Sequence, residues 1–197
     1  MIKAVLFDLD GIVMWPREEY YSVRYAREKE VPVERINEFF LNDFKSCVFG
    51  TCDLKESISA HLPKWSWEGD ADAFLARWFE AEGKTDPRVL EIIDALRAKG
   101  YPCYIATRQE KYRMRYLLEE VGLGKHFDGT FVTCEIGFDK SEKEFWERVL
   151  EKLALSPGEI LFFDDRKENV EAASAFGIRA RLYDGIGVLE EEAAALL

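Results

Sequence analysis

The sequence lacks the features of several classes of protein. None of its four cysteines stands in a CxxC pair and it has only two histidines, so the residue types of a soft-metal site are scarce. No apolar run approaches the roughly 20 residues that a membrane helix needs. The apolar run after Lys3 is also too short for a signal peptide. We therefore expect reduced thiols and a cytoplasmic protein.

Basic side chains are fewer than acidic ones. The 197 residues include 38 aspartates and glutamates but 27 lysines and arginines, which gives a formal net charge of −11. Such a charge repels a nucleic-acid backbone and an anionic membrane surface, so we expect neither as a partner. With 48% hydrophobic and 33% charged residues, the composition is that of a globular protein with one core and room for a smaller inserted module.

Short apolar runs recur along the chain at intervals that are typical of a parallel sheet. Five of them predict buried strands, at residues 2–7, 101–106, 129–133, 160–163 and 178–182. Amphipathic periods between the runs predict helices, most clearly in the segment that follows Asp86 and Pro87 and ends at Gly100. The alternation of helix and strand after residue 86 favours a doubly wound α/β fold, with helices on both faces of a parallel sheet.

About seventy residues, 16–85, interrupt this alternation. They show helical signals at residues 17–30, 34–44 and 71–81 and after Asp53, but no convincing strand. We therefore divide the chain into a catalytic core of residues 1–15 and 86–197 and an inserted helical cap of residues 16–85. Most of the aromatic rings in the insertion are expected to form the cap's own core.

Pairs of acidic residues follow two of the predicted strands. Asp8 and Asp10 follow the first strand, and Asp164 and Asp165 follow the fourth. The carboxyl ends of parallel strands lie at one edge of the sheet, where open α/β folds bind ligands. A single aspartate there is more often a turn residue or a helix cap. Four carboxylates at one edge repel one another unless a hard divalent cation joins them, and this favours a Mg²⁺ site.

A hydroxyl and two kinds of basic side chain are the other candidates for a site. Thr107 and Arg108 end the second predicted strand, where a helix start can bind a phosphoryl oxygen, although Thr107 alone is more typical of a helix N-cap. Lys140 follows the third strand, and Lys143, one helical turn later, is its alternative. The Arg108 guanidinium could bind an anionic substrate group or pair with Glu110 or another surface acid.

Four motifs resemble, in order and spacing, those of the haloacid dehalogenase-like hydrolase superfamily. They are Asp8-Leu9-Asp10-Gly11, Thr107, Lys140 and a last motif that reads Asp164-Asp165-x-x-x-Asn169. The resemblance extends from Ile2 to about Tyr183, and residues 16–85 stand where this family carries a helical cap of its first type, as its sugar-phosphatase-like members do. The chain departs from the family pattern at Arg108, where relatives have a small polar residue, and at Ser141, where they have proline.

The resemblance implies a Rossmann-like core and a Mg²⁺-dependent phosphatase that hydrolyses a small phosphate monoester. In family terms Asp8 would attack phosphorus to form an aspartyl-phosphate, and Asp10 would protonate the leaving group and then activate water. Mg²⁺ would be held by Asp8, the backbone carbonyl of Asp10, Asp165 and, directly or through water, Asp164. Thr107 and Lys140 would bind the phosphoryl oxygens.

The same motifs leave other activities open. In a phosphomutase the aspartyl-phosphate passes to a sugar hydroxyl instead of water, and the choice depends on how the cap shields it. A dehalogenase normally lacks the second aspartate of the first motif, so Asp10 argues against that activity. A non-catalytic binding protein is a further alternative, against which the presence of every expected carboxylate argues.

Substrate specificity is expected to come from the cap. The first candidates, by their closeness to the first strand, are Trp15, Arg17, Tyr20, Tyr21 and Arg24. The cap must open and close to admit substrate and exclude water, with expected hinges at residues 14–16 and 85–87. The expected partner is a small phosphorylated metabolite, and the expected assembly is a monomer or a dimer.

Overall fold

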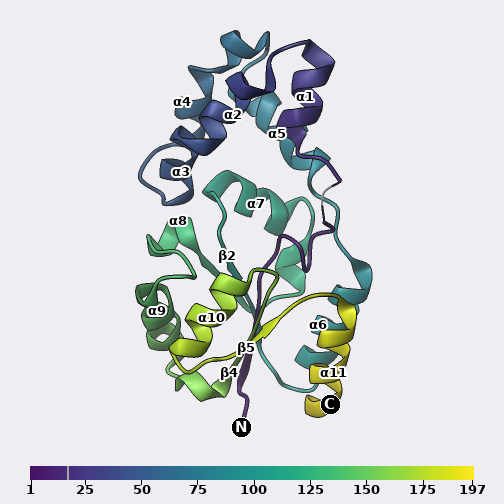
Figure 1. Cartoon of the computed structure of the whole chain (residues 1–197). Helices are drawn as coiled ribbons and strands as arrows, with labels where there is room; N and C mark the ends of the chain where they lie inside the picture. The colour runs from purple at the N-terminus through teal and green to yellow at the C-terminus, as the bar shows by residue number, and fades with distance from the viewer. Residues whose placement is uncertain (17) are drawn as a thin grey trace.

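A five-stranded sheet forms the centre of the larger part of the chain (Figure 1). The computed structural model describes residues 1–16 and 18–197, so the predicted specificity residue Arg17 lies outside the described residues. The strands are β1 (Ala4–Phe7), β2 (Cys103–Thr107), β3 (Gly129–Val132), β4 (Ile160–Asp164) and β5 (Arg179–Leu182). All neighbouring pairs are parallel. The five predicted strands and the doubly wound α/β fold are thereby confirmed.

The order of the strands, β3-β2-β1-β4-β5, places β1 beside β4. The chain runs outward from β1 through β2 to β3 and then returns to the other side of β1 as β4. Phe7 of β1 is in register with Phe163 of β4, so the residues that follow them leave the sheet at the same level. Ligands of open α/β sheets bind at such a reversal of strand order, beyond the carboxyl ends of the strands. The two acidic pairs therefore lie at this point of reversal.

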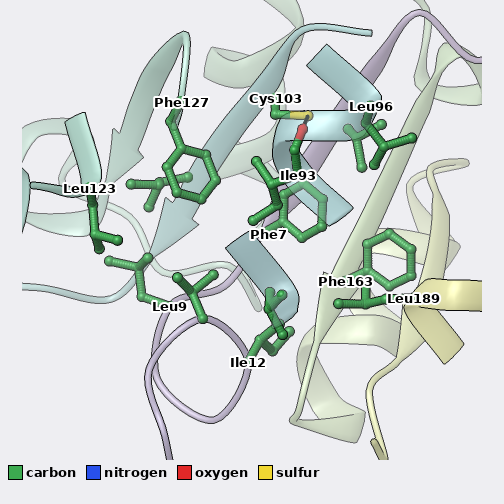
Figure 2. Packing of buried hydrophobic residues seen from close by; sticks show 14 of the residues in the cluster. Phe7, Leu9, Ile12, Ile93, Leu96, Cys103, Leu123, Phe127, Phe163 and Leu189 are labelled. Atoms are coloured by element: carbon green, nitrogen blue, oxygen red, sulfur yellow. Dashed lines mark hydrogen bonds between the residues drawn. The ribbon is translucent and has the colours of Figure 1, made fainter. Parts of the chain in front are cut away.

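Helices cover both faces of the sheet. α6 (Pro87–Ala98), α7 (Lys111–Glu119) and α11 (Ile186–Leu196) contribute to the cluster around Phe7, in which Ile93 and Leu189 also lie (Figure 2). α9 (Lys143–Leu153) and α10 (Lys167–Ala175) pack on the opposite face, around Leu6 and Phe162. Successive residues of a strand point to opposite faces, so β1 contributes to both clusters. The shorter α8 (Thr133–Ile136) and the 3-10 turns η2 (Leu123–Lys125) and η3 (Pro157–Glu159) complete this part.

β5 differs from the expectation of a buried strand. Its residues are mostly exposed because it lies at the edge of the sheet. Arg179 and Arg181 point to α11 and form ion pairs with the buried Glu192. Charged side chains on an edge strand hinder its pairing with a second chain. The strand β5 can therefore remain exposed at the edge of the sheet.

The segment between β1 and α6 is helical. It contains α1 (Tyr21–Lys29), α2 (Val33–Leu41), α3 (Asp43–Val48), α4 (Leu54–Ser59), the 3-10 turn η1 (Leu62–Trp65) and α5 (Ala71–Ala81). The single helix expected at residues 34–44 is instead two helices, because the backbone turns at Asn42, where φ is −115° and ψ is −80°. These helices pack around a separate aromatic cluster and lie beyond the carboxyl ends of the strands (Figure 1). No helix in the described part of the chain is long and apolar enough to cross a membrane.

Two extended connections join these helices to the sheet. Met14 forms a bridge with Thr85, Trp15 N donates to Lys84 O at 2.9 Å, and Asp86 N donates to Val13 O at 2.9 Å. The two connections named as hinges therefore lie side by side, and the helical segment leaves and rejoins the sheet at one place.

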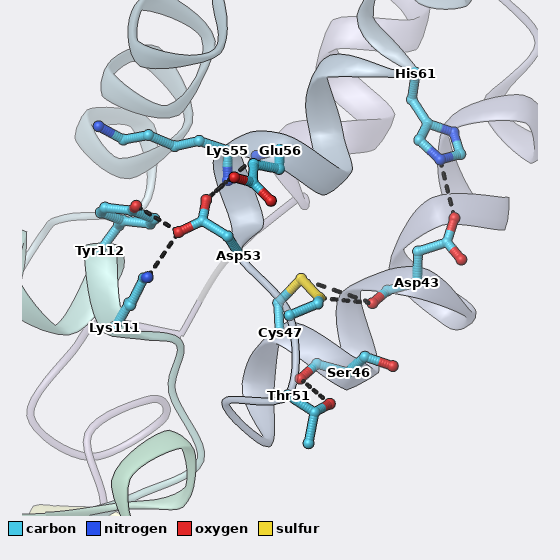
Figure 3. Close-up of a disulfide and its surroundings, with 11 residues drawn as sticks. Asp43, Ser46, Cys47, Thr51, Asp53, Lys55, Glu56, His61, Lys111 and Tyr112 are labelled. Carbon is cyan, nitrogen blue, oxygen red and sulfur yellow. Dashed lines mark hydrogen bonds and ion pairs between the residues drawn. A yellow bond between two sulfur atoms is a disulfide. The ribbon is translucent and has the colours of Figure 1, made fainter.

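Cys47 and Cys52 form a disulfide between the end of α3 and the residues before α4 (Figure 3). The expectation of reduced thiols is wrong for this pair, whereas Cys103 and Cys134 are free. The turn that ends α3 brings the two Cα atoms to 4.7 Å, within the range that a disulfide requires. The spacing of the two cysteines in the sequence carries no information on this turn.

Candidate active site

Three carboxylates from two neighbouring strands lie together where the strand order reverses. Asp8 follows β1, Asp164 ends β4, and Asp165 comes next. One oxygen of each carboxylate lies within 4.8 Å of the others, and Asp8 and Asp164 are buried while Asp165 is exposed. This donor set fits a hard divalent cation, which takes one or two carboxylates and completes its coordination with water and substrate oxygens.

Lys140 lies between two of these carboxylates. Its Nζ is 2.6 Å from Oδ2 of Asp8 and 2.6 Å from Oδ2 of Asp164, and its side chain is 1% exposed. Burial by itself would lower the pKa of Lys140, but the two carboxylates outweigh it and hold this pKa above its ordinary value. The alternative, Lys143, is 67% exposed and pairs with Glu147 at 3.4 Å. The structure therefore brings Lys140, and not Lys143, to the acidic group.

The environment of Asp8 opposes its ionisation. Burial raises the pKa of Asp8 to about 6, Lys140 counters this effect, and the negative charge of Asp164 adds to it. Oδ1 of Asp8 accepts a hydrogen bond from the backbone N–H of Leu9 at 2.8 Å. The carboxylate is therefore poorly solvated, with Lys140 as its compensating positive charge.

Asp164 is held by the first turn of α10. Its Oδ1 accepts from Asn169 Nδ2 at 3.0 Å and from the backbone N–H of Arg166 at 2.9 Å, and its Oδ2 accepts from Asn169 Nδ2 at 3.1 Å. The Asp-Asp-x-x-x-Asn spacing of the sequence thus corresponds to a strand end and the following helical turn. These bonds orient a carboxylate that is buried behind Asp8 and Lys140.

Gly11 makes room for Asp165. The backbone of Gly11 has a φ of +86°, and a Cβ atom at this position would lie 2.2 Å from Oδ2 of Asp165. Any other residue would therefore displace the carboxylate and would adopt a disfavoured backbone conformation.

The Asp10 carboxylate is not part of this group of three. It accepts a hydrogen bond from Gln109 Nε2 at 2.7 Å and lies 3.4 Å from Arg113 Nη2. Arg113 also donates to the carbonyl oxygen of Glu82 at 3.2 Å, and so connects α7 to the end of α5. Sequence reasoning missed Gln109 and Arg113. The available signal was their position just beyond the second strand, on the loop and first helical turn that reach the same sheet edge.

Thr107 and Arg108 have different surroundings. Thr107 ends β2 and is buried. It is not the N-cap of α7, because Glu110 takes that place by accepting from the backbone N–H groups of Tyr112 and Arg113. Arg108 Nε lies 3.2 Å from Oδ2 of Asp139, so Arg108 pairs with a surface acid, but with Asp139 rather than Glu110.

A cavity of about 360 Å³ joins these residues. Its walls include Asp8, Asp10, Thr107, Arg108, Lys140 and Asp165, whereas Asp164 lies behind the wall. Trp15 and Tyr20 line it as well. The other two described specificity candidates do not: Tyr21 packs in the aromatic cluster, and Arg24 pairs with Glu28 at 3.6 Å.

The chain is similar in sequence to known proteins over most of its length. A sequence model described as haloacid dehalogenase-like hydrolase matches residues 2–177. A phosphorylated carbohydrates phosphatase of Thermotoga maritima is 26% identical over 210 residues, covering 100% of this chain and 94% of that protein. A GMP/IMP nucleotidase of Escherichia coli is 31% identical over 90 residues, or 46% of this chain and 40% of the nucleotidase.

The fold also matches a solved structure. An enzyme of the HAD family from Bacteroides thetaiotaomicron superimposes with a TM-score of 0.81 at 18% identity, covering 95% of this chain and 98% of the other. The same enzyme has been solved with magnesium and inorganic phosphate bound. At this level of identity the likeness shows a shared fold.

Proposed function

Because the chain belongs to the haloacid dehalogenase-like hydrolase family, we propose that it is a Mg²⁺-dependent phosphatase acting on a small phosphate monoester. The observation that carries the proposal is the group of Asp8, Asp164 and Asp165 with Lys140 buried among them. A site with a cation beside a nucleophilic carboxylate suits a phosphoryl group, whose transfer requires charge neutralisation and an in-line nucleophile. The name of the Thermotoga relative, which matches over 94% of its length, supports a phosphate ester as substrate.

The residues present fit a magnesium ion. Asp8, Asp165 and the backbone carbonyl of Asp10 would hold it, with Asp164 behind them as a direct or water-mediated partner. When bound, Mg²⁺ would neutralise charge on the phosphoryl oxygens. The proposed role of Lys140 and Thr107 is to bind the same oxygens, and Arg108 would join them by leaving Asp139 for the substrate.

Asp8 is the proposed nucleophile. Its carboxylate oxygen attacks phosphorus, the bond from phosphorus to the ester oxygen breaks, and an aspartyl-phosphate forms with release of the alcohol. Asp10 donates the proton that the departing oxygen takes up. In the second step Asp10 accepts a proton from a water molecule that attacks phosphorus, which releases inorganic phosphate and restores Asp8.

We also propose that residues 16–85 act as a cap on a core of residues 1–15 and 86–197. The separate aromatic cluster and the paired connections at Met14 and Thr85 support this division. A polar contact also links the two parts: Oδ2 of Asp53 lies 2.7 Å from Lys111 Nζ and 2.7 Å from Tyr112 Oη (Figure 3). Such a contact can break and re-form as a cap opens and closes.

The test is the release of inorganic phosphate from a panel of small phosphate monoesters, with Mg²⁺ and with a chelator. We expect metal-dependent release by the wild type and none by Asp8→Asn, which keeps the size of the side chain but removes the nucleophile. Lys143→Gln is the matched control and should retain activity, because Lys143 lies outside the site. A folded protein that binds Mg²⁺ and releases no phosphate from any ester would contradict the proposal and favour a phosphomutase or a binding protein.

A further inference from the structure

A second cavity, of about 610 Å³, continues from the first. The two cavities share Asp10, Tyr20, Arg108 and Arg166 in their walls. Asp10 is the group to which we assign proton donation to the ester oxygen, so the carbon skeleton attached to that oxygen extends from Asp10. The second cavity therefore lies where the leaving group of the substrate goes.

The walls that the helices of residues 16–85 contribute to this cavity are largely apolar. The apolar lining residues come from four helices and are Val23, Phe40, Leu41, Phe44, Val48 and Trp78. The rings of Phe40, Phe44 and Trp78 pack edge to face, with centroids 5.0 to 5.5 Å apart. Mutual packing restricts the rotation of these rings, so the cavity presents a preformed apolar surface.

Exposed apolar side chains gather around the two cavities. Leu41 is 77% exposed and Tyr20 is 61% exposed, and both line the second cavity. Trp15, which is also exposed, lines the first. Exposed apolar side chains around a concave site are typical of a surface that an apolar ligand covers.

The polar groups closest to Asp10 are already engaged with one another. Gln109 donates to Asp10, Arg113 contacts both Asp10 and Glu82, and Glu82 accepts from the backbone N–H of Tyr21 at 2.9 Å. The remaining polar lining residues are Ser22, Asn37 and Lys45, on the helices of residues 16–85, and Arg108 and Arg166, which line both cavities. Next to Asp10, a leaving group rich in hydroxyls would have to displace the bonds of Gln109, Arg113 and Glu82, whereas an apolar one would not.

We propose that the second cavity binds an apolar leaving group, so that this enzyme prefers phosphate monoesters of alcohols with an extended hydrocarbon body over sugar phosphates. The inference rests on the proposed function, since it takes Asp10 as the proton donor. Each methylene that enters the cavity is expected to raise kcat/KM by about fourfold, the gain from burying one methylene group.

The experiment compares butyl, hexyl and octyl phosphate, whose leaving alcohols have nearly equal pKa values, with glycerol phosphate and glucose 6-phosphate. We expect kcat/KM to rise along the alkyl series, mainly through KM, and the sugar phosphate to be the poorer substrate. An equal kcat/KM along the series, or a preference for glucose 6-phosphate, would overturn the inference while leaving the phosphatase proposal intact. Absence of phosphate release from every ester would instead contradict the proposed function.

Substitutions in the cavity provide a second measurement. Phe44→Ala and Leu41→Gln should both reduce the gain in kcat/KM per methylene. Because Leu41 is exposed, Leu41→Gln should leave the stability of the fold unchanged. Leu182→Gln is the control, because Leu182 is also exposed but lies on the edge strand β5 and lines neither cavity. An unchanged dependence on chain length in both cavity variants would overturn the inference.

Discussion

Gln109 donates a hydrogen bond of 2.7 Å from its side-chain amide to Oδ2 of Asp10. The bond joins the loop after β2 to the loop after β1, and Gln109 is buried. It holds the carboxylate that we assign to proton transfer in one orientation, beside both cavities. Gln109 is therefore a positioning residue in the proposed mechanism.

Gln109→Leu should lower kcat/KM for an alkyl phosphate by about tenfold, because Asp10 would no longer be held in place. General acid catalysis contributes about a hundredfold or more, and this variant should lose only part of it. The ester 4-nitrophenyl phosphate should be affected much less, because its leaving group departs without a proton. Asp10→Asn should give the same contrast in a stronger form. An equal loss on both substrates would show that Gln109 has only a structural role.

Gly11→Ala should weaken the binding of Mg²⁺. The new Cβ atom would displace Asp165, and displacing a group that supports a metal site reduces affinity by about tenfold or more. Gly100→Ala is the matched control: its φ is +91°, but nothing lies within 4 Å of the added Cβ. Both variants should lose about 1 kcal/mol of unfolding free energy from backbone strain. Titration of activity with Mg²⁺ should separate them, and equal affinities would contradict the assignment of Asp165.

Glu110→Gln should stabilise the protein at alkaline pH. Burial raises the pKa of Glu110 from 4.5 to about 7, against the opposing effect of the N–H groups of Arg113 and Tyr112. Its Oε1 has no hydrogen-bond partner among the described residues. Because the folded-state pKa is the higher one, the contribution of Glu110 to stability is fully present below pH 4.5 and is lost as the pH rises through 7.

The gain in unfolding free energy from Glu110→Gln should therefore increase by about 2 to 3 kcal/mol between pH 5 and pH 8. Urea unfolding of both proteins at the two pH values measures this difference. A gain that does not change with pH would mean that Glu110 titrates normally in the folded protein.

Loss of the contact at Asp53 should favour an open cap. Lys111→Met combined with Tyr112→Phe removes both side-chain donors to Oδ2 of Asp53, but leaves Asp53 as the N-cap of α4. A contact of about 1 kcal/mol shifts an open-to-closed equilibrium by about fivefold, so kcat/KM should fall by up to that factor. Lys143→Gln again serves as control. Unchanged kinetics would indicate that this contact does not govern closure.

The disulfide should stabilise the helical segment of residues 16–85. Cys47 and Cys52 are five residues apart in the sequence, and closing so short a loop contributes about 2 kcal/mol by the chain-entropy model. Cys47→Ser combined with Cys52→Ser should lower the unfolding free energy by about this amount, measured by urea denaturation. A reductant should have the same effect on the wild type and none on the double variant. Equal stability of all four samples would contradict the prediction.

The sequence by itself determined the parallel α/β fold and the place of the acidic pairs. Both depend on patterns that are local in the chain, namely apolar runs of the length of a strand and carboxylates directly after them. Asp8 and Asp164 could be predicted to meet because adjacent parallel strands end at the same edge of a sheet. The helix after Asp86 was predictable for the same reason, since its cap, its first proline and its apolar stripe lie within one short segment.

Only the tertiary structure decided which side chains of the loops and helices meet at the site. Gln109 and Arg113 reach Asp10 across 99 and 103 residues of sequence, and local propensity carries no information on such contacts. The choice of Lys140 over Lys143 likewise depended on which ammonium group the loop before α9 buries between Asp8 and Asp164. The apolar wall around Trp78 arises from the packing of four helices. Contacts of this kind depend on the relative placement of whole elements, which the packing of the entire chain determines.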